Sequence, residues 1–144
     1  MKKIHRTIAL LLTLVGLVGC ITLDHVPLAA AHIKFDLVDS PVIGVEKTRL
    51  DMEDGQLVLT GYVVKIWGAT DTTITHLDVT IYDFAGHILS STVAYFEPRQ
   101  IPPFRKMNGS AHYRVVITPS PEIIARIEVR AREGSHGDAN PAVP

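Results

Sequence analysis

"IIARIEVRAR", residues 123–132, is the stretch that most directly specifies a fold. Two sets of side chains alternate along it: the apolar Ile123, Ala125, Ile127, Val129 and Ala131, and the charged Arg126, Glu128, Arg130 and Arg132. Successive side chains of a β-strand point to opposite faces of the sheet, so this two-residue period separates a core face from a solvent face. It predicts a half-buried strand.

Similar signals recur along most of the chain. Further strands are expected at residues 43–51, 57–66, 77–82, 88–96 and 112–118. In the strand at 57–66, both alternating sets of side chains are largely apolar, which is typical of a central strand covered on both faces. Turn-forming pairs such as Asp54-Gly55 lie between strands, and no segment after residue 31 has a sustained helical period. The pattern predicts an all-β fold, an antiparallel immunoglobulin-like sandwich of six to seven strands.

The first residues have the features of an export signal. Lys2, Lys3 and Arg6 precede the apolar span Ile8 to Leu23. A charged segment followed by an apolar one is the arrangement of a secretory signal peptide. A membrane-spanning helix needs roughly 20 apolar residues. A cleaved helical signal peptide is therefore expected before the sandwich.

The charge balance argues against a nucleic-acid-binding function. The chain has 14 Lys and Arg against 15 Asp and Glu, and loss of the three basic residues of the signal leaves a net charge of −4. Nucleic-acid binding needs a clustered basic face. Here Glu122, Glu128 and Glu133 interleave with the arginines of residues 126–132, which indicates a solvated strand face.

Leu17-Val18-Gly19-Cys20 directly follows the core of the apolar span and resembles the lipobox of bacterial lipoproteins. The resemblance implies that a signal peptidase recognises Leu17, Val18 and Gly19 and cuts before Cys20. It also implies a diacylglyceryl thioether on Cys20 and a fatty acid such as palmitate on the new amino terminus. Two or more acyl chains hold a protein stably on a membrane. Because Ile21 and not Asp follows the cysteine, the resemblance points to the outer membrane, facing the periplasm.

Two alternatives for the N-terminal segment remain open. Cleavage after Ala29-Ala30-Ala31 would discard Cys20, but twelve residues would then separate Gly19 from His32. An uncleaved membrane anchor is the other alternative. Cys20 is the only cysteine, so a disulfide within the chain is excluded.

The predicted domains are a signal peptide (1–19), a lipidated tether (20–31), the sandwich (32–133) and a disordered tail (134–144). Within the sandwich, four runs resemble bacterial FxLYD-type and related immunoglobulin-like domains: Leu59-Thr60-Gly61-Tyr62-Val63, Ile74 to Tyr82, Tyr82-Asp83-Phe84-Ala85-Gly86-His87-Ile88-Leu89 and Tyr113-Arg114-Val115-Val116-Ile117. The resemblance covers roughly residues 43–132. It implies an accessory extracytoplasmic module without catalytic residues.

The sequence lacks patterns of a catalytic or metal site. His32, His76, His87 and His112 lie one per segment without ligand spacing, whereas a metal normally needs three or four converging ligands. The serines occur without a nucleophile elbow, and no glycine-rich phosphate loop is present. We therefore expect no enzyme activity, no metal and no cofactor.

Residues 95–106 combine aromatic, proline and basic residues between two expected strands. Exposed aromatics and arginine are common interface hot spots, and prolines lower the cost of ordering a loop. The candidate partner-binding residues are Phe96, Arg99, Phe104 and Arg105. The alternative is that Phe96, Ile101 and Phe104 plug one end of the sandwich.

These observations favour a lipid-anchored, non-catalytic protein of the cell envelope that acts as a binding or assembly module. Its expected partners are the membrane, through the lipid anchor, and another envelope protein. The alternative is a small envelope enzyme or metal-binding protein.

Overall fold

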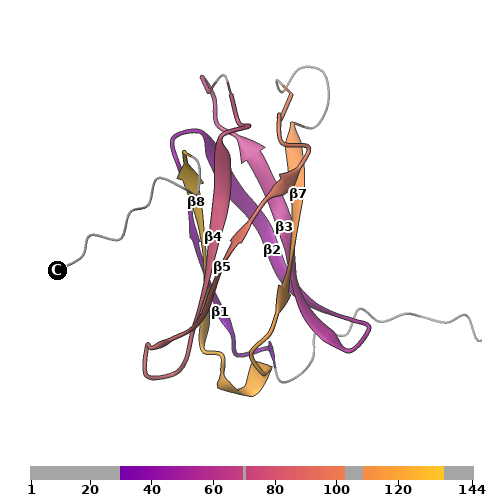
Figure 1. Cartoon of the computed structure of the whole chain (residues 1–144), viewed down its shortest axis with the longest axis vertical. Coiled ribbons are helices and arrows are strands. Elements are labelled where there is room, and N and C mark those ends of the chain that lie inside the picture. Colours follow the sequence, from indigo (N-terminus) through magenta and orange to yellow (C-terminus); the bar gives the residue numbers. More distant parts are fainter. Residues whose placement is uncertain (1–29, 70, 103–108, 135–144) are drawn as a thin grey trace, which may run out of the picture.

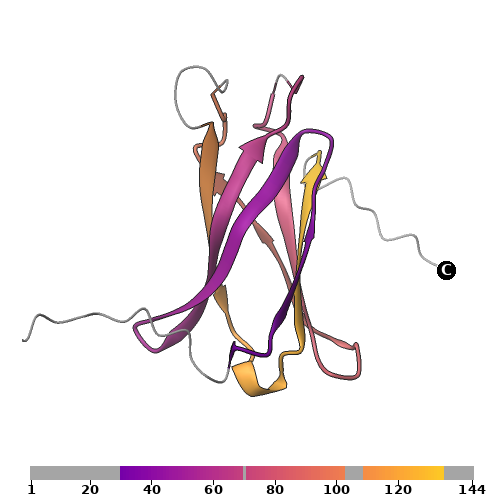
Figure 2. The same ribbon diagram turned by 180° about the vertical axis from the view of Figure 1, so that it is seen from behind.

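Eight strands form two sheets in the described part of the computed structural model, residues 30–69, 71–102 and 109–134 (Figure 1). The elements, in chain order, are β1 (Lys34–Val38), β2 (Ile43–Glu53), β3 (Gln56–Lys65), β4 (Thr75–Tyr82), β5 (Ile88–Ala94), β6 (Phe96–Glu97), β7 (Ser110–Ile117), the 3-10 turn η2 (Pro121–Ile123) and β8 (Arg126–Glu133). Figure 2 shows the same two layers from behind. The predicted all-β sandwich is confirmed.

The first sheet has the order β1-β8-β4-β5 and the second has the order β2-β3-β7-β6. All pairs are antiparallel except β1 with β8, which is parallel.

The structure has two more strands than the six ranges expected from the sequence. Residues 88–96 divide into β5 and β6 because the chain passes from one sheet to the other at Tyr95. β1 lacks a sequence signal because most of its side chains are exposed.

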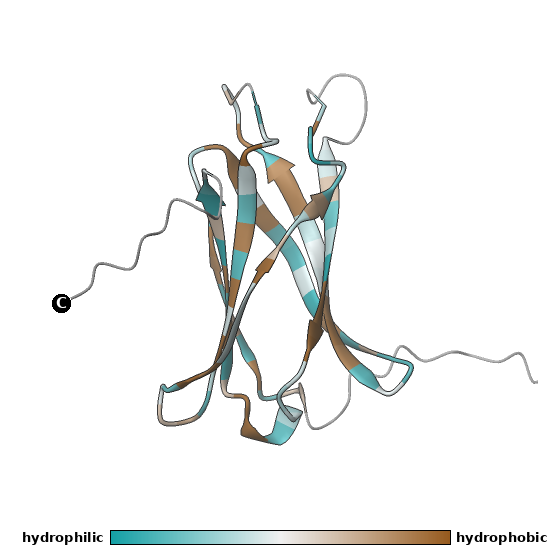
Figure 3. Cartoon of the chain, viewed as in Figure 1, coloured by the Kyte–Doolittle hydropathy of each residue, from teal (hydrophilic) through white to brown (hydrophobic). Residues whose placement is uncertain are grey.

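The inner faces of the two sheets form one core. On β3, Leu57, Leu59 and Val63 point inward, and on β8, Ile127 and Val129 do so. Brown and teal segments alternate along several strands in Figure 3, as the two-residue period predicts. Val58 and Thr60, on the outer row of β3, are also buried. This confirms that β3 is covered on both faces over part of its length.

The alternation predicted for residues 123–132 is wrong at its first residues. Pro121 starts the turn η2, whose 3-10 backbone runs to Ile123, and β8 begins only at Arg126. A 3-10 turn advances about three residues per turn, so it breaks the two-residue period. As a result Ile124 is fully buried, while Ile123 is about half exposed.

A bulge in β2 and a glycine in β3 accommodate Tyr113. The register between β2 and β3 shifts between Glu46 and Arg49, and Thr48 within this bulge makes a 2.6 Å hydrogen bond with the Tyr113 hydroxyl. Tyr113 on β7 pairs with Gly61, and its ring occupies the space that a side chain at residue 61 would fill. Burial raises the pKa of Tyr113 to about 12, so the phenol stays neutral at physiological pH.

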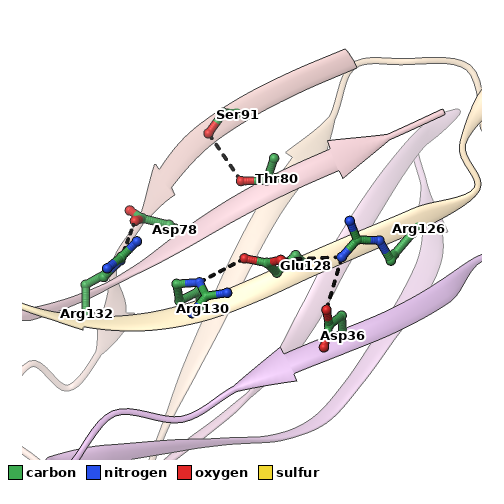
Figure 4. A network of polar contacts seen from close by, with 8 residues as sticks. All are labelled: Asp36, Asp78, Thr80, Ser91, Arg126, Glu128, Arg130 and Arg132. Atoms are coloured by element: carbon green, nitrogen blue, oxygen red, sulfur yellow. Dashed lines mark hydrogen bonds and ion pairs between the residues drawn. The ribbon is translucent and has the colours of Figure 1, made fainter. Parts of the chain in front are cut away.

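The outer face of the first sheet carries a network of paired charges (Figure 4). Arg126 contacts Asp36 at 3.0 Å and Glu128 at 3.4 Å, and Glu128 also contacts Arg130 at 2.9 Å. Arg132 contacts Asp78 at 3.1 Å. Each exposed pair is worth about 0–1 kcal/mol, so the network contributes modestly to stability. Each of these arginines faces a carboxylate, as the interleaved sequence predicts for a solvated face.

Candidate partner-binding surface

The sandwich has two distinct ends. At the "base" lie the β4–β5 turn (residues 83–87), η2 and Ala30, where the described chain starts (Figure 1). At the opposite "loop end" lie the β3–β4 connection and the connection between β6 and β7 (Figures 1 and 2). The described residues of the loop end are 66–69, 71–74 and 98–102, together with Tyr95, whose ring lies beside Arg99. Hence the described chain starts at one end, and the described residues of these two connections lie at the other.

Thr72 joins the two connections of the loop end. Its side chain is fully buried; the hydroxyl donates a 2.7 Å hydrogen bond to the carbonyl of Arg99 and accepts a 2.9 Å bond from the N–H of Ile101. The N–H of Thr72 donates to the side-chain carbonyl of Gln100. A buried hydroxyl that satisfies two backbone groups on another segment fixes the position of that segment.

Arg99 supports the loop end from inside. Its guanidinium lies 4.6 Å from the ring centre of Tyr95 and 5.1 Å from that of Phe96, and Nη2 donates to the carbonyl of Thr73. Among the described residues, Nη1 of Arg99 is buried without a hydrogen-bond partner. Such stacking over an aromatic face is a typical use of arginine. Arg99 therefore holds the two connections together. Its guanidinium group mainly contacts groups of the protein itself.

Large apolar side chains are exposed on this stiffened end. Trp67 is 96% exposed, and Ile74 and Tyr95 are each more than half exposed. Trp67 belongs to the turn where the N–H of Ala69 donates to the carbonyl of Ile66. Exposed apolar groups on a rigid support are the usual anchors of protein interfaces, because little further ordering is needed on binding.

The structure separates the residues that sequence reasoning had grouped. Phe96 is only 1% exposed and Ile101 is fully buried, so both plug the sandwich end, as the alternative interpretation holds. Phe96 is therefore not a surface residue, and the neighbouring Tyr95 takes that place. Phe104 and Arg105 lie outside the described residues, as do Leu17, Val18, Gly19 and Cys20. Trp67 and Ile74 were not among the candidates expected from the sequence. For Trp67, the available signal was an isolated tryptophan before a glycine.

A shallow depression of about 500 Å³ lies on the outer face of the second sheet. It is lined by Glu46, Lys47, Tyr62, Val64, Lys65, Gly109 and Ser110. The β2 bulge gives Lys47 a positive φ of 50° and places its ammonium group 5.8 Å from the ring centre of Tyr62. The lining offers charged groups and an aromatic face.

The four histidines of the sandwich lie in separate surroundings. His32 stacks on Phe84 at the base, His87 contacts Asp83 in the β4–β5 turn, and His76 contacts Asp78 on β4. His112 on β7 packs edge-on against Tyr62, its partner on the neighbouring strand β3 of the second sheet. Within the described ranges, no three His, Cys, Asp or Glu side chains are grouped as metal ligands.

Among the helices in the part of the chain that the structure describes, none has the length and apolar character needed to cross a membrane.

Comparisons with protein-family models, curated proteins and solved structures gave no match to this chain. The resemblances to bacterial lipoproteins and to FxLYD-type domains therefore stay predictions.

Proposed function

We propose that this protein is a lipid-anchored, non-catalytic β-sandwich of the bacterial cell envelope that binds another envelope protein through its loop end. The observation that carries the proposal is the exposure of Trp67 and Ile74 on the β3–β4 connection, which Thr72 and Arg99 join to the connection after β6, and of Tyr95 beside Arg99. The predicted anchor at Cys20 precedes Ala30, which lies at the opposite end. A protein held at its base presents the loop end away from the membrane.

The proposal has an electrostatic component as well. The arginines on the outer face of the first sheet pair with carboxylates, so that face offers little net charge to a partner. Recognition at the loop end would then depend mainly on apolar contact. Interfaces of this kind are dominated by a few buried aromatic anchors surrounded by contacts of small effect.

Replacing Trp67 and Tyr95 with alanine should abolish partner binding without unfolding the domain. Loss of an aromatic hot spot costs about 2 kcal/mol or more, which is about a thirtyfold loss of affinity. Trp67 is almost fully exposed and Tyr95 is more than half exposed, so the loss of stability should be limited to the stacking of Arg99 on Tyr95, about 0.5–1 kcal/mol. The measurement is affinity purification of the tagged, membrane-anchored protein after cross-linking, with each recovered protein quantified.

Arg49→Ala is a matched control, because Arg49 is exposed on β2 and its ion pair with Asp51 lies outside the loop end. Partner recovery should be unchanged in this control. Equal recovery with the Trp67→Ala/Tyr95→Ala variant and with wild type would contradict binding through the loop end.

The anchor itself has a separate test. Cells grown with a clickable fatty acid should label the wild-type protein and not the Cys20→Ser variant, because the thioether requires the thiol. After fractionation, the wild type should be found in the outer membrane. Equal, weak labelling of both proteins, with a mature amino terminus at His32, would show cleavage after Ala31 and remove the anchor from the proposal.

A further inference from the structure

Three more large apolar side chains are exposed near the base, apart from those of the loop end. Phe84 is 70% exposed and Ile88 is 62% exposed, both at the β4–β5 turn, and Ile123 of η2 is about half exposed. We call these three side chains the base patch. Its members come from two segments that are far apart in the sequence, so their association depends on how the two segments are joined.

Several contacts join these segments. The ring of His32 stacks on Phe84 with 5.5 Å between ring centres, and its Nε2 lies 2.9 Å from the carbonyl oxygen of Ile124. The N–H of Ala125 donates a 2.9 Å hydrogen bond to the carbonyl of Tyr82. His32 thus bridges the β4–β5 turn and the residue after η2, and it is itself only two residues from the start of the described chain.

The turn that presents Phe84 is held in a defined shape. Asp83 Oδ1 accepts 2.8 Å hydrogen bonds from the N–H groups of Ala85 and His87, and Gly86 has the positive φ of 86° that the turn requires. The hydrogen bond from the His87 N–H is the main cause that lowers the pKa of Asp83, so this carboxylate stays ionised at neutral pH. The exposed Phe84 is therefore presented by a turn of defined shape.

The residues that precede Ala30 in the sequence indicate what covers this patch. Ala30 is buried at the base, and Cys20 precedes it by ten residues, a segment that spans at most about 35 Å. The longest strand, β2, has 11 residues and extends about 36 Å, so the loop end lies at the limit of the distance that this segment can span from the base. Resting on the proposed acylation of Cys20, this geometry favours the base patch over the loop end as the surface that meets the bilayer.

We propose that the base patch docks onto the bilayer that holds the lipid anchor, with Phe84, Ile88 and Ile123 entering the interfacial region. Once the lipid anchor is inserted, the base patch meets the bilayer at a high effective concentration. A small apolar patch is then enough for docking. Ionised Asp83 lies beside the patch, and the pKa of Glu122 is also lowered, chiefly by its hydrogen bond with Ser120. The loop end then faces the periplasm.

The single tryptophan of the chain makes this docking measurable. The full-length acylated protein is reconstituted into phosphatidylcholine vesicles with brominated acyl chains, which quench tryptophan fluorescence on contact. In a Trp67→Phe background, Phe84→Trp places the probe in the base patch, and Ile123→Trp is a second probe if the first variant does not fold. We expect the base probes to lose most of their fluorescence in brominated vesicles, while wild-type Trp67 keeps its fluorescence.

The outcomes distinguish docking from anchoring. If the protein floats with the vesicles but the base probes are not quenched, the anchor stands and the docking is wrong. If the acylated protein does not float with vesicles, the anchor fails and the inference fails with it. If bromolipid has no effect but native membranes shield the base probes from acrylamide, a protein covers the base and the docking is again overturned.

Discussion

Gly61→Ala should destabilise the sandwich by about 2 kcal/mol, within the range of about 1–3 kcal/mol that inserting a methyl group into a packed core costs. A Cβ at residue 61 would lie 2.5 Å from the Tyr113 hydroxyl oxygen and 2.7 Å from two ring carbons. Tyr113 is almost completely buried, and Thr48 holds its hydroxyl, so the ring has little room to move. The gain from a less flexible unfolded chain, about 0.4–1 kcal/mol, is smaller than the clash.

Chemical and thermal unfolding measure this effect. For a domain of this size the melting temperature should fall by about 10 °C. Gly44→Ala is the matched control in the neighbouring strand β2, because its Cβ would make only ordinary contacts at 3.4–3.5 Å. If Gly61→Ala is as stable as Gly44→Ala, the placement of the Tyr113 ring is wrong. The double variant Gly61→Ala/Tyr113→Leu should lose less stability than the sum of its single changes, because shortening the side chain removes the clash.

Thr72→Val should destabilise the protein by about 2 kcal/mol or more and weaken partner binding at the loop end. Valine keeps the shape of threonine and removes the hydroxyl that serves the Arg99 carbonyl and the Ile101 N–H. A buried polar group left without a partner costs about 1–3 kcal/mol. Because both groups belong to the connection after β6, that connection would no longer be fixed to the β3–β4 connection.

Two controls separate the hydroxyl from the side-chain shape. Thr72→Ser keeps the hydroxyl and should retain most of the stability and the partner recovery. Thr73→Val alters an exposed threonine whose hydroxyl contacts Asp71, and it should have a small effect. Equal unfolding free energies for Thr72→Val and Thr72→Ser would contradict the role assigned to this hydrogen-bonded link.

Residues 95–106 show how far sequence reasoning could go at the candidate site. The described part of this segment, residues 95–102, lies at the end of the sandwich, but composition could not sort buried from exposed aromatics. Tyr95 and Phe96 are adjacent and chemically similar, yet one is exposed and the other is in the core. The difference arises where the chain leaves the first sheet after Ala94 and enters the second at Phe96. Which residue makes that crossing depends on pairing with β7, which is far away in the sequence.

The sequence by itself determined most of the strands, the core and solvent faces of those strands and the Asp83–Gly86 turn, because these depend on a two-residue period and on local backbone preferences. Only the tertiary structure decided the order of the strands, the parallel pairing of β1 with β8, and the burial of Ile124 in place of Ile123. It also brought Thr72 to Arg99 and His32 to Phe84. An alternating strand can pair with many neighbours, and the choice is made by joint burial of inner faces and by hydrogen bonds between distant segments.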